Sequence, residues 1–258
     1  MLAVVLELFC GTARFSRAME AHRPVMRWDI LFGDKYDLRS RSNQELVLGW
    51  LRAGWLAAIW LRTPCQSFSR ARNQPGGPPA LRDKQHVHGL PGLRPCDQQA
   101  VEIGNTMARF SARVLLTAAL LLVPAVMENP ALSWIWQTRW LSSLARRRDF
   151  EFTVTEFCQW QKLPFRKATG FLHTCVELTL GERRCLGGRR GLCVATQQPH
   201  RPLTGLTPDG KFWTKVAEPY PRALCRRAAA DIDGAVAARR HQLVKLTLAL
   251  KIQPIDNL

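Results

Sequence analysis

The chain has 258 residues, of which 47% are hydrophobic and 22% are charged, a composition that predicts one globular domain with at most a small appendage and excludes wholesale disorder. Lysine and arginine number 37 against 20 acidic residues, so the net charge is +17 and the expected partner is a polyanion, nucleic acid before an anionic membrane surface. The alternative is a basic protein that its arginines keep soluble. Residues 131–258 hold 21 basic and 10 acidic residues, and we expect this half of the chain to face the polyanion.

Neither the start of the chain nor its most apolar stretch is typical of a signal peptide or a membrane-spanning segment. The first residues lack a basic lead and a small-residue cleavage site. Residues 114–127 are strongly apolar, but they are too few to span a bilayer and they include Pro124. The 8 cysteines form no dense framework, which predicts reduced thiols in an intracellular protein, nuclear in a eukaryote and otherwise cytoplasmic. We expect a monomer without a membrane partner.

Alternating strand and helix patterns occupy the first third of the chain. Apolar runs predict strands at 2–8, 24–28 and 55–61. Helical periodicity between these runs predicts helices at 16–21 and 44–53. This β-α-β order predicts an α/β fold, with a mostly parallel sheet covered by helices, whose ligands bind beyond the carboxyl ends of the strands.

The patterns after residue 61 are less regular. Residues 73–95 are rich in proline, glycine and arginine, and an irregular stretch of this length is usually functional or disordered. Between 174 and 205 the arginines alternate with Gly, Cys and His, without a helical or strand period. The other predicted elements are a helix at 101–122, strands at 124–127 and 150–157, and a helix at 231–250.

Residues 6–16 form a predicted strand, a turn of small residues and the start of a helix. Such a turn allows a ligand to approach the backbone at Gly11. Asp29 ends the next strand, where many nucleoside-binding folds place a ribose-binding carboxylate, and Asp37 could accept a hydrogen bond from an adenine amino group. The turn alone is equally consistent with an ordinary βα turn, and each acid alone is more often a solvated loop residue.

Cys65 lies in the sequence Thr-Pro-Cys-Gln-Ser-Phe-Ser, after an apolar strand and before the basic irregular stretch. A cysteine in this place suits a nucleophile that is presented to a substrate, and we expect Arg70 and Arg72 to favour its thiolate. The alternative for an arbitrary cysteine is a small buried hydrophobe.

Four segments together resemble the cytosine-5 DNA methyltransferases, in the order of that family's motifs. Residues 6–16 are similar to its methyl-donor turn, an acidic-Leu-Phe-x-Gly sequence that ends in Phe-Ser. Residues 64–69 (Pro-Cys-Gln-x-Phe-Ser) match its nucleophile motif at each fixed position. Residues 128–130 (Glu-Asn-Pro) resemble its glutamate-asparagine motif, and residues 161–169 its arginine motif. The resemblance covers about residues 1–170 and implies a Rossmann-like S-adenosylmethionine-dependent methyltransferase fold.

The resemblance also implies a reaction, the transfer of a methyl group from S-adenosylmethionine to carbon 5 of a cytosine flipped out of duplex DNA. Cys65 would add to C6 of the ring, and Glu128 would bind N3 and the exocyclic amine. Arg166 or Lys167 would orient the base or Glu128, and the loop 69–95 would close over the DNA. The residues implied in binding S-adenosylmethionine are Phe9, Gly11, Thr12, Asp29, Asp37 and Pro64.

The sequence departs from the family pattern at several positions. Ala13 and Arg14 stand where glycines are usual, and Thr169 stands where a second arginine is common. No segment clearly matches the Gly-Asn motif that usually closes the catalytic domain, for which residues 220–222 (Tyr-Pro-Arg) are a loose candidate. A DNA-binding relative without turnover and an RNA cytosine-5 methyltransferase are therefore the alternative functions.

The region after the last motif is expected to recognise the target. We divide the chain into a catalytic domain (1–173), a short target-recognition region (174–215) and a C-terminal helical segment that completes the domain (216–258). The arginines of this region, Arg189 and Arg190 among them, are predicted to contact phosphates or bases, or else to form a solvated face. Thiol and imidazole side chains in this region could bind zinc. Their spacing fits no paired-cysteine zinc pattern, and the alternative is that the thiols are unrelated to one another. These side chains belong to Cys175, Cys185, Cys193 and His200.

Overall fold

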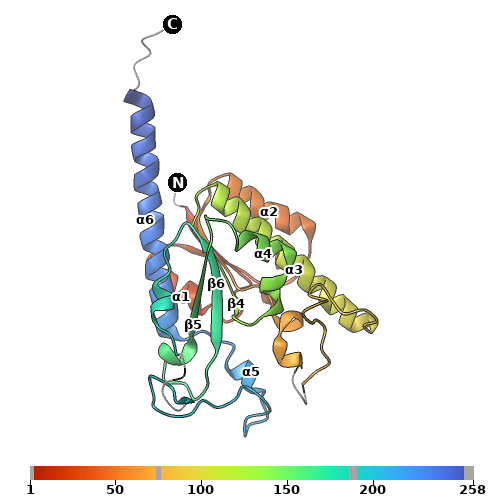
Figure 1. Cartoon of the computed structure of the whole chain (residues 1–258). Helices are drawn as coiled ribbons and strands as arrows, with labels where there is room; N and C mark the ends of the chain where they lie inside the picture. The colour runs from red at the N-terminus through yellow and green to blue at the C-terminus, as the bar shows by residue number, and fades with distance from the viewer. Residues whose placement is uncertain (1–2, 74–76, 186, 188–190, 253–258) are drawn as a thin grey trace.

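The computed structural model describes residues 3–73, 77–185, 187 and 191–252, with side chains described as far as His241. Strands form one sheet in the order β2-β1-β3-β4-β6-β5 (Figure 1). In this sheet β6 runs antiparallel to both of its neighbours and the other pairings are parallel. The strands are β1 (Val4–Leu8), β2 (Val25–Trp28), β3 (Leu56–Leu61), β4 (Ala125–Pro130), β5 (Glu151–Glu156) and β6 (Ala168–Thr174).

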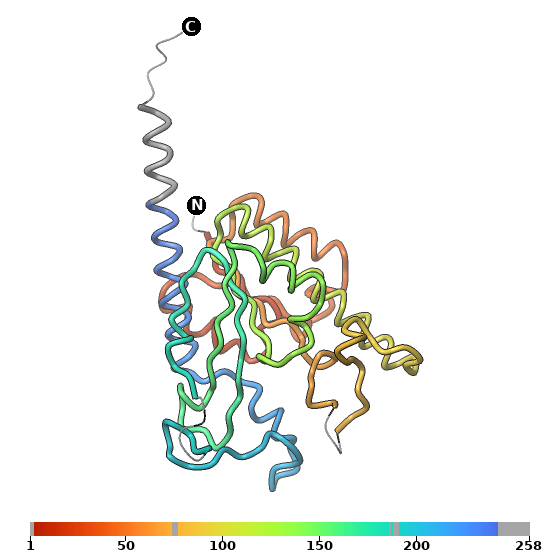
Figure 2. Tube along the Cα trace, in the orientation of Figure 1, coloured from red at the N-terminus to blue at the C-terminus, as the bar shows by residue number. Residues whose placement is uncertain are grey.

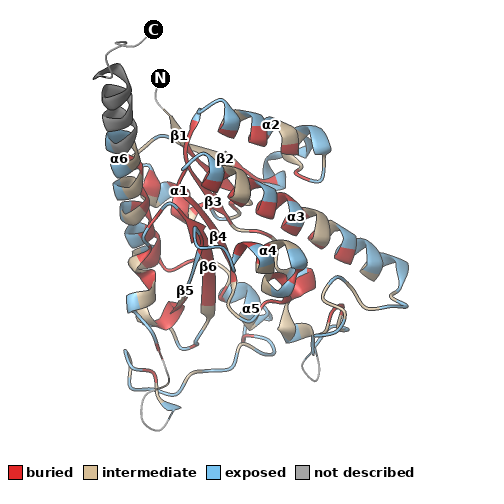
Figure 3. Cartoon of the chain, turned by 45° about the horizontal axis from the view of Figure 1, so that its top comes forward, coloured by how far each residue is buried: buried red, intermediate tan, exposed pale blue. Residues whose placement is uncertain are grey.

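The helices are α1 (Arg14–Met19), α2 (Arg41–Arg52), α3 (Pro95–Leu120), α4 (Arg139–Leu144), α5 (Trp213–Val216) and α6 (Arg222–Ile252). All but α5 cover the two faces of the sheet, which are both apolar because side chains alternate in direction along each strand. Leu6 and Ile59 belong to the apolar core under α2, α3 and α4, whereas Val5 and Trp60 belong to the core under α1 and α6. Figure 3 shows the buried residues along the strands and on the inner faces of these helices. Among the described residues, no helix combines the length and apolarity needed to cross a membrane.

The order of the strands creates a topological switch point between β1 and β3. The chain passes from β1 to β2 on one side and returns to β3 on the other. In open α/β sheets, the crevice outside the carboxyl ends of two such strands is the usual place for a ligand. Because β6 is antiparallel, its first residues lie at the same edge, where Thr169 is in register with Pro130 of β4. This carboxyl edge therefore gathers the ends of β1 to β4 and the start of β6.

The structure confirms the predicted α/β class and the mostly parallel sheet, an architecture consistent with a Rossmann-like fold. The predicted strands and helices of the first third correspond to β1, α1, β2, α2 and β3, and residues 1–2 of the first predicted strand lie outside the described residues.

Several elements differ from the prediction, among them α4 and α5, where the sequence analysis places no helix. The sequence analysis places no strand at β6, since Gly170 and several buried polar residues interrupt its apolar pattern. α3 begins at Pro95, within the stretch predicted to be irregular. α6 begins at Arg222 and not at residue 231, because Leu224 and Ala228 of its first turns also pack on the sheet.

Candidate active site

The turn between β1 and α1 contains three residues with a left-handed backbone, Phe9 (φ 58°), Gly11 (φ 49°) and Ala13 (φ 51°). Asp29 fixes this turn from the end of β2. Its Oδ2 accepts a hydrogen bond from the Gly11 N–H at 2.8 Å, and its Oδ1 accepts one from the Leu31 N–H at 2.9 Å. Asp29 is 8% exposed. It therefore joins the ends of β1 and β2, and a ligand would use the lone pairs that these two bonds leave free.

The two residues that replace glycines in this turn have separate roles. Ala13 adopts a backbone conformation that favours glycine, at an energetic cost of about 1–2 kcal/mol. The Arg14 Nη1 donates a hydrogen bond to the Tyr220 carbonyl oxygen at 2.6 Å, which ties the turn to the segment before α6. Thr12, the residue between Gly11 and Ala13, is exposed.

Asp37 lies at the end of a 3-10 helix, η2 (Asp34–Tyr36), and its carboxylate already has a cationic partner. The Arg39 Nε lies 2.8 Å from Oδ2, and the Arg39 backbone N–H donates to Oδ1 at 2.8 Å. An adenine amino group would compete with Arg39 for this carboxylate.

Pro64 and Cys65 follow β3 and are half-buried, at the start of η3 (Gln66–Phe68). Burial is the largest cause that raises the pKa of the Cys65 thiol, and the Glu128 carboxylate raises it further. The positive charges of Lys167 and Arg62 oppose these two effects and favour the thiolate.

The prediction that Arg70 and Arg72 favour this thiolate is therefore corrected to Lys167 and Arg62. The Arg70 guanidinium carbon lies 3.9 Å from the centroid of the Trp134 ring. The Arg72 Nε donates to the Pro79 carbonyl oxygen at 2.9 Å. Both arginines are thus held by side-chain contacts elsewhere.

The end of β4 contributes a carboxylate and an amide. Glu128 is 3% exposed, and its Oε2 accepts a hydrogen bond from the Tyr220 hydroxyl at 2.9 Å. The Asn129 Nδ2 donates to the Thr63 carbonyl oxygen at 2.7 Å, two residues before Cys65. Asn129 therefore holds the Cys65 segment against β4, and its neighbour Glu128 places a buried carboxylate beside that segment.

Arg62, to which the sequence analysis assigns no role, lies between the β1 turn and Cys65. Its Nη2 donates to the Glu218 carbonyl oxygen at 2.7 Å, and its guanidinium carbon lies 5.1 Å from the Tyr220 ring centroid. A Cβ atom at Gly11 would come within 3.0 Å of the Arg62 Nη1, so glycine permits this close approach. A charged residue at the end of an apolar strand is the sequence signal that could have identified it.

Glu7, the residue before the last of β1, is a second charged residue without a predicted role, and it is fully buried. Its Oε2 accepts hydrogen bonds from the Ser16 N–H at 2.9 Å and from the Ser16 hydroxyl. Burial raises the pKa of Glu7 to about 7, against the lowering effect of the Ser16 hydrogen bonds and of Arg62 and Arg27. Glu7 therefore joins α1 to β1 and titrates near neutral pH.

The two predicted basic residues before β6 occupy different environments. Arg166 is exposed, and its Nη2 donates to the Glu156 Oε1 at 3.0 Å. The Lys167 ammonium lies 4.6 Å from the Phe157 ring centroid. Burial is the largest cause that lowers the pKa of Lys167, and the Glu128 carboxylate opposes it. Of the two, Lys167 is the one whose charge acts on Cys65 and Glu128.

The described part of the loop 69–95 is anchored by Arg82, which is 1% exposed. Its guanidinium carbon lies 3.7 Å from the Phe68 ring centroid, directly beside the Cys65 segment. Burial lowers the pKa of Arg82 to about 10, so the side chain remains charged at neutral pH. Its hydrogen-bond acceptors are the carbonyl oxygens of Ser67 (2.9 Å), Val87 (2.7 Å) and Val101 (3.0 Å), the Asn105 Oδ1 (2.8 Å) and the Ser67 Oγ (3.1 Å).

The described arginines of the predicted target-recognition region contact side chains of the protein itself. Arg183 and Arg201 lie over the rings of Trp160 and Trp213, and Arg184 pairs with Glu156. Arg189 and Arg190, which we predict to contact phosphate, lie outside the described residues.

The predicted soft-ligand set is wrong at one residue. Cys175 follows β6, which runs away from the carboxyl edge, so it lies at the opposite edge of the sheet and is exposed. There it lines a hollow of about 690 Å³ with Leu122 and Arg239. Cys158, which follows β5 at the carboxyl edge, takes its place beside Cys185.

No protein-family model matches the sequence, and no curated protein matches it. Among solved structures, the chain is similar to that of the Entamoeba histolytica methyltransferase EhMeth, with 10% sequence identity and a TM-score of 0.38. The alignment covers 69% of this chain and 55% of that one, so this chain spans about half the length of EhMeth. Similarity at this level assigns neither a family nor an activity to the chain.

Proposed function

We propose that the chain is an S-adenosylmethionine-dependent methyltransferase that methylates carbon 5 of cytosine in DNA. The observation that carries the proposal is the convergence of Cys65, Glu128 and Lys167 at the carboxyl edge, where β3 and β4 end and the neighbouring β6 begins and where the Asn129–Thr63 hydrogen bond joins the Cys65 segment to β4. They adjoin the switch point, where the β1 turn lies. A nucleophile, an acid and a cation beside a nucleoside-binding crevice are the groups that this reaction requires.

The residues around the β1 turn fit an S-adenosyl donor. The left-handed backbone at Phe9 and Gly11 lets a ligand approach the main chain, and the buried Asp29 retains lone pairs for ribose hydroxyls. When bound there, the donor would supply an electrophilic methyl group.

The chain's own residues would then act on a cytosine that is flipped out of the duplex. The Cys65 thiolate, favoured by Lys167 and Arg62, adds to C6 of the ring, and the electron pair of the C5–C6 bond becomes available at C5. Glu128 holds a proton at N3 and offsets the charge that develops on the ring. C5 gains the methyl group, its proton leaves, and the restored C5–C6 double bond expels the Cys65 thiolate.

A second candidate function is DNA binding without turnover. The Tyr220 hydroxyl already occupies the Glu128 Oε2, and Arg39 already occupies Asp37. Either contact would oppose the reaction if it persisted when DNA and the donor were bound.

The test uses the full chain with a radiolabelled donor, duplex DNA or RNA, and DNA that contains 5-fluorocytosine at the target. We expect methyl transfer to DNA and a covalent adduct with the fluorinated base, because fluorine cannot leave as the C5 proton does. Cys65→Ala should abolish both, whereas Cys96→Ala, which removes an exposed thiol from the start of α3, should change neither. Glu128→Gln should slow transfer roughly 100- to 10,000-fold.

The other outcomes are equally informative. Methyl transfer by Cys65→Ala would refute the covalent mechanism. Tight binding of DNA and donor without an adduct would favour the second candidate, and transfer to RNA alone would replace DNA as the substrate.

A further inference from the structure

A group of metal-ligating side chains lies apart from Cys65 and Glu128, in the loops that follow β5 and η7 (Thr179–Glu182). Cys158 belongs to η6 (Phe157–Gln159), directly after β5, and Cys185 comes shortly after η7. Figure 2 shows these two segments at the same end of the sheet. Cys193 and His200 stand close to either end of a short hairpin that a Leu192–Pro199 bridge closes.

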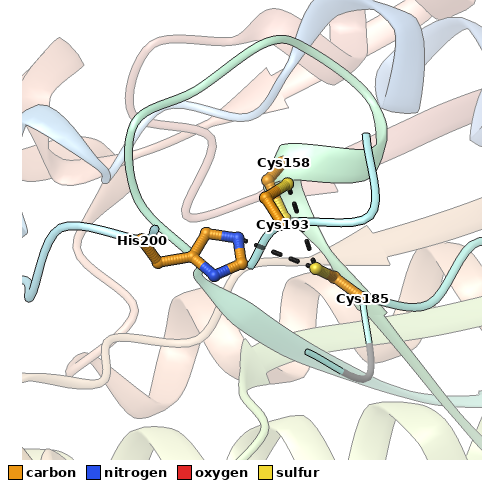
Figure 4. A group of neighbouring side chains, drawn as sticks. All are labelled: Cys158, Cys185, Cys193 and His200. Atoms are coloured by element: carbon orange, nitrogen blue, oxygen red, sulfur yellow. Dashed lines mark hydrogen bonds between the residues drawn. The ribbon is translucent and has the colours of Figure 1, made fainter. Parts of the chain in front are cut away.

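Figure 4 shows that the four side chains converge on a common point. Their ligand atoms, three sulfurs and one imidazole nitrogen, all lie within 4.8 Å of one another. The Cys185 Sγ is 4.0 Å from the Cys193 Sγ and 3.7 Å from the His200 Nε2. In a tetrahedral zinc site, bonds of about 2.3 Å to sulfur and 2.0 Å to nitrogen separate two sulfurs by about 3.8 Å and a sulfur and a nitrogen by about 3.5 Å. The two separations from the Cys185 Sγ are close to these values, and a small adjustment of the side chains would bring the set around one ion.

We infer that Cys158, Cys185, Cys193 and His200 hold a structural zinc ion. Three thiolates and one imidazole form a closed set of soft ligands, a donor combination that selects zinc and leaves no position for a substrate. The inference does not rest on the proposed methyl transfer, because none of the four ligands belongs to the candidate active site.

Burial supports a shared ligand over unrelated thiols. Cys158, Cys185 and Cys193 are each at most 1% exposed, and together they form a cluster separate from the two apolar cores of the sheet. Around them, the described residues from 183 to 212 form bridges and turns but no α-helix or strand. A loop-rich segment with so small an apolar core generally needs a metal or a disulfide to stay folded. All the cysteines are free in the structure, which leaves the metal.

Neighbouring polar groups contact the proposed ligands and fix their orientation, as such groups do around the ligands of known metal sites. The Gln159 Nε2 lies 3.5 Å from the Cys158 Sγ and 3.9 Å from the Cys193 Sγ, so its N–H groups face both sulfurs. The Cys185 N–H donates to the Glu156 Oε2 at 2.7 Å. Glu156 is fully buried and also accepts from Arg166 and Arg184.

A zinc ion here would fasten the arginine-containing loops to the end of β5. Through Glu156 and Arg166, it would also fix the segment that leads into Lys167. The ion would therefore hold the predicted target-recognition region beside the candidate active site.

The test measures the metal content of the full chain, purified from zinc-supplemented cells without chelators. We expect about one zinc per chain by elemental mass spectrometry. Cys158→Ser and His200→Ala should lower the zinc content several-fold, whereas Cys175→Ser, which removes the exposed thiol at the other edge of the sheet, should leave it unchanged. Zinc removal should lower the melting temperature and expose residues 183–212 to protease.

Cobalt substitution keeps the test decisive if a serine variant does not fold. Cobalt(II) bound to the wild-type chain should give the intense visible and thiolate-to-metal bands of a tetrahedral site. Cys193→His should retain the metal with altered bands. A folded wild-type chain that binds neither zinc nor cobalt, a disulfide among the three cysteines, or zinc lost in Cys175→Ser but kept in Cys158→Ser would overturn the assignment.

Discussion

Replacing Arg82 with methionine tests whether this buried arginine holds the Cys65 segment in place. The variant keeps an aliphatic chain on Phe68 but removes the guanidinium donors to the acceptors of Ser67, Val87, Val101 and Asn105. The Val101 carbonyl oxygen lies within α3 and keeps a helical partner, whereas Ser67 is buried, so water cannot replace the guanidinium at its carbonyl oxygen without opening the loop. An unsatisfied buried acceptor costs about 1–3 kcal/mol, which gives a loss of about 2 kcal/mol for the Ser67 carbonyl.

For a chain of this size, such a loss lowers the melting temperature by roughly 4–8 °C. The measurement is thermal unfolding of Arg82→Met followed by circular dichroism, with limited trypsin digestion as a probe of the loop. Lys84→Met is the matched control, since it removes an exposed cation from the same loop. Gly104 should be similarly sensitive, because a Cβ there would come within 2.2 Å of the Ser67 Oγ. If Arg82→Met and Lys84→Met melted within about 1 °C of each other, the anchoring role of Arg82 would be refuted.

Two other substitutions test the buried acids. Burial raises the pKa of Glu7 to about 7, above the value of about 4.3 in an unfolded chain, so the folded protein keeps a proton that the unfolded chain loses between these pH values. Wild-type stability should therefore fall as pH rises through this window, and Glu7→Gln should exceed the wild type by up to about 3 kcal/mol at pH 8 and equal it near pH 4, as urea unfolding at both pH values will report. Tyr220→Phe removes the hydroxyl that donates to Glu128, and if that bond positions the acid, methyl transfer should slow roughly 10- to 100-fold at unchanged DNA affinity. Faster transfer by Tyr220→Phe would instead identify the hydroxyl as a block on Glu128.

The parts of the fold that the sequence predicts are those in which local pattern and tertiary environment agree. β1 and β3 are buried on both faces, so their runs are apolar, with Glu7 of β1 as the exception, and their helices follow with a clear period. The sequence likewise predicts that Asp29, Cys65 and Glu128 lie at one edge of the sheet. Each of them ends or follows a predicted strand, and the carboxyl ends of parallel strands share one edge.

The remaining features depend on contacts between distant residues. β6 forms as an antiparallel strand between β4 and β5, where the Nε2 of its buried His173 lies 2.9 Å from the Thr153 Oγ1 of β5. The choice between Cys158 and Cys175 depends on the direction of β6, since the two cysteines lie near each other in sequence and at opposite edges of the sheet. The spacing of residues along the sequence shows neither the direction of a strand nor the edge of the sheet at which a residue lies.

Two departures from the pattern that the sequence resembles are connected in space. Arg14 stands where a glycine is usual in that pattern, and its guanidinium holds the carbonyl oxygen of Tyr220, in the segment that lacks a clear Gly-Asn motif. Arg62 holds the carbonyl oxygen of Glu218 in the same segment, and the Tyr220 hydroxyl reaches Glu128. The segment before α6 is thus bound to the start of α1 and to the ends of β3 and β4. Because Arg14 holds the segment that replaces the usual motif, these two departures are better explained as one closure of the site than as independent changes.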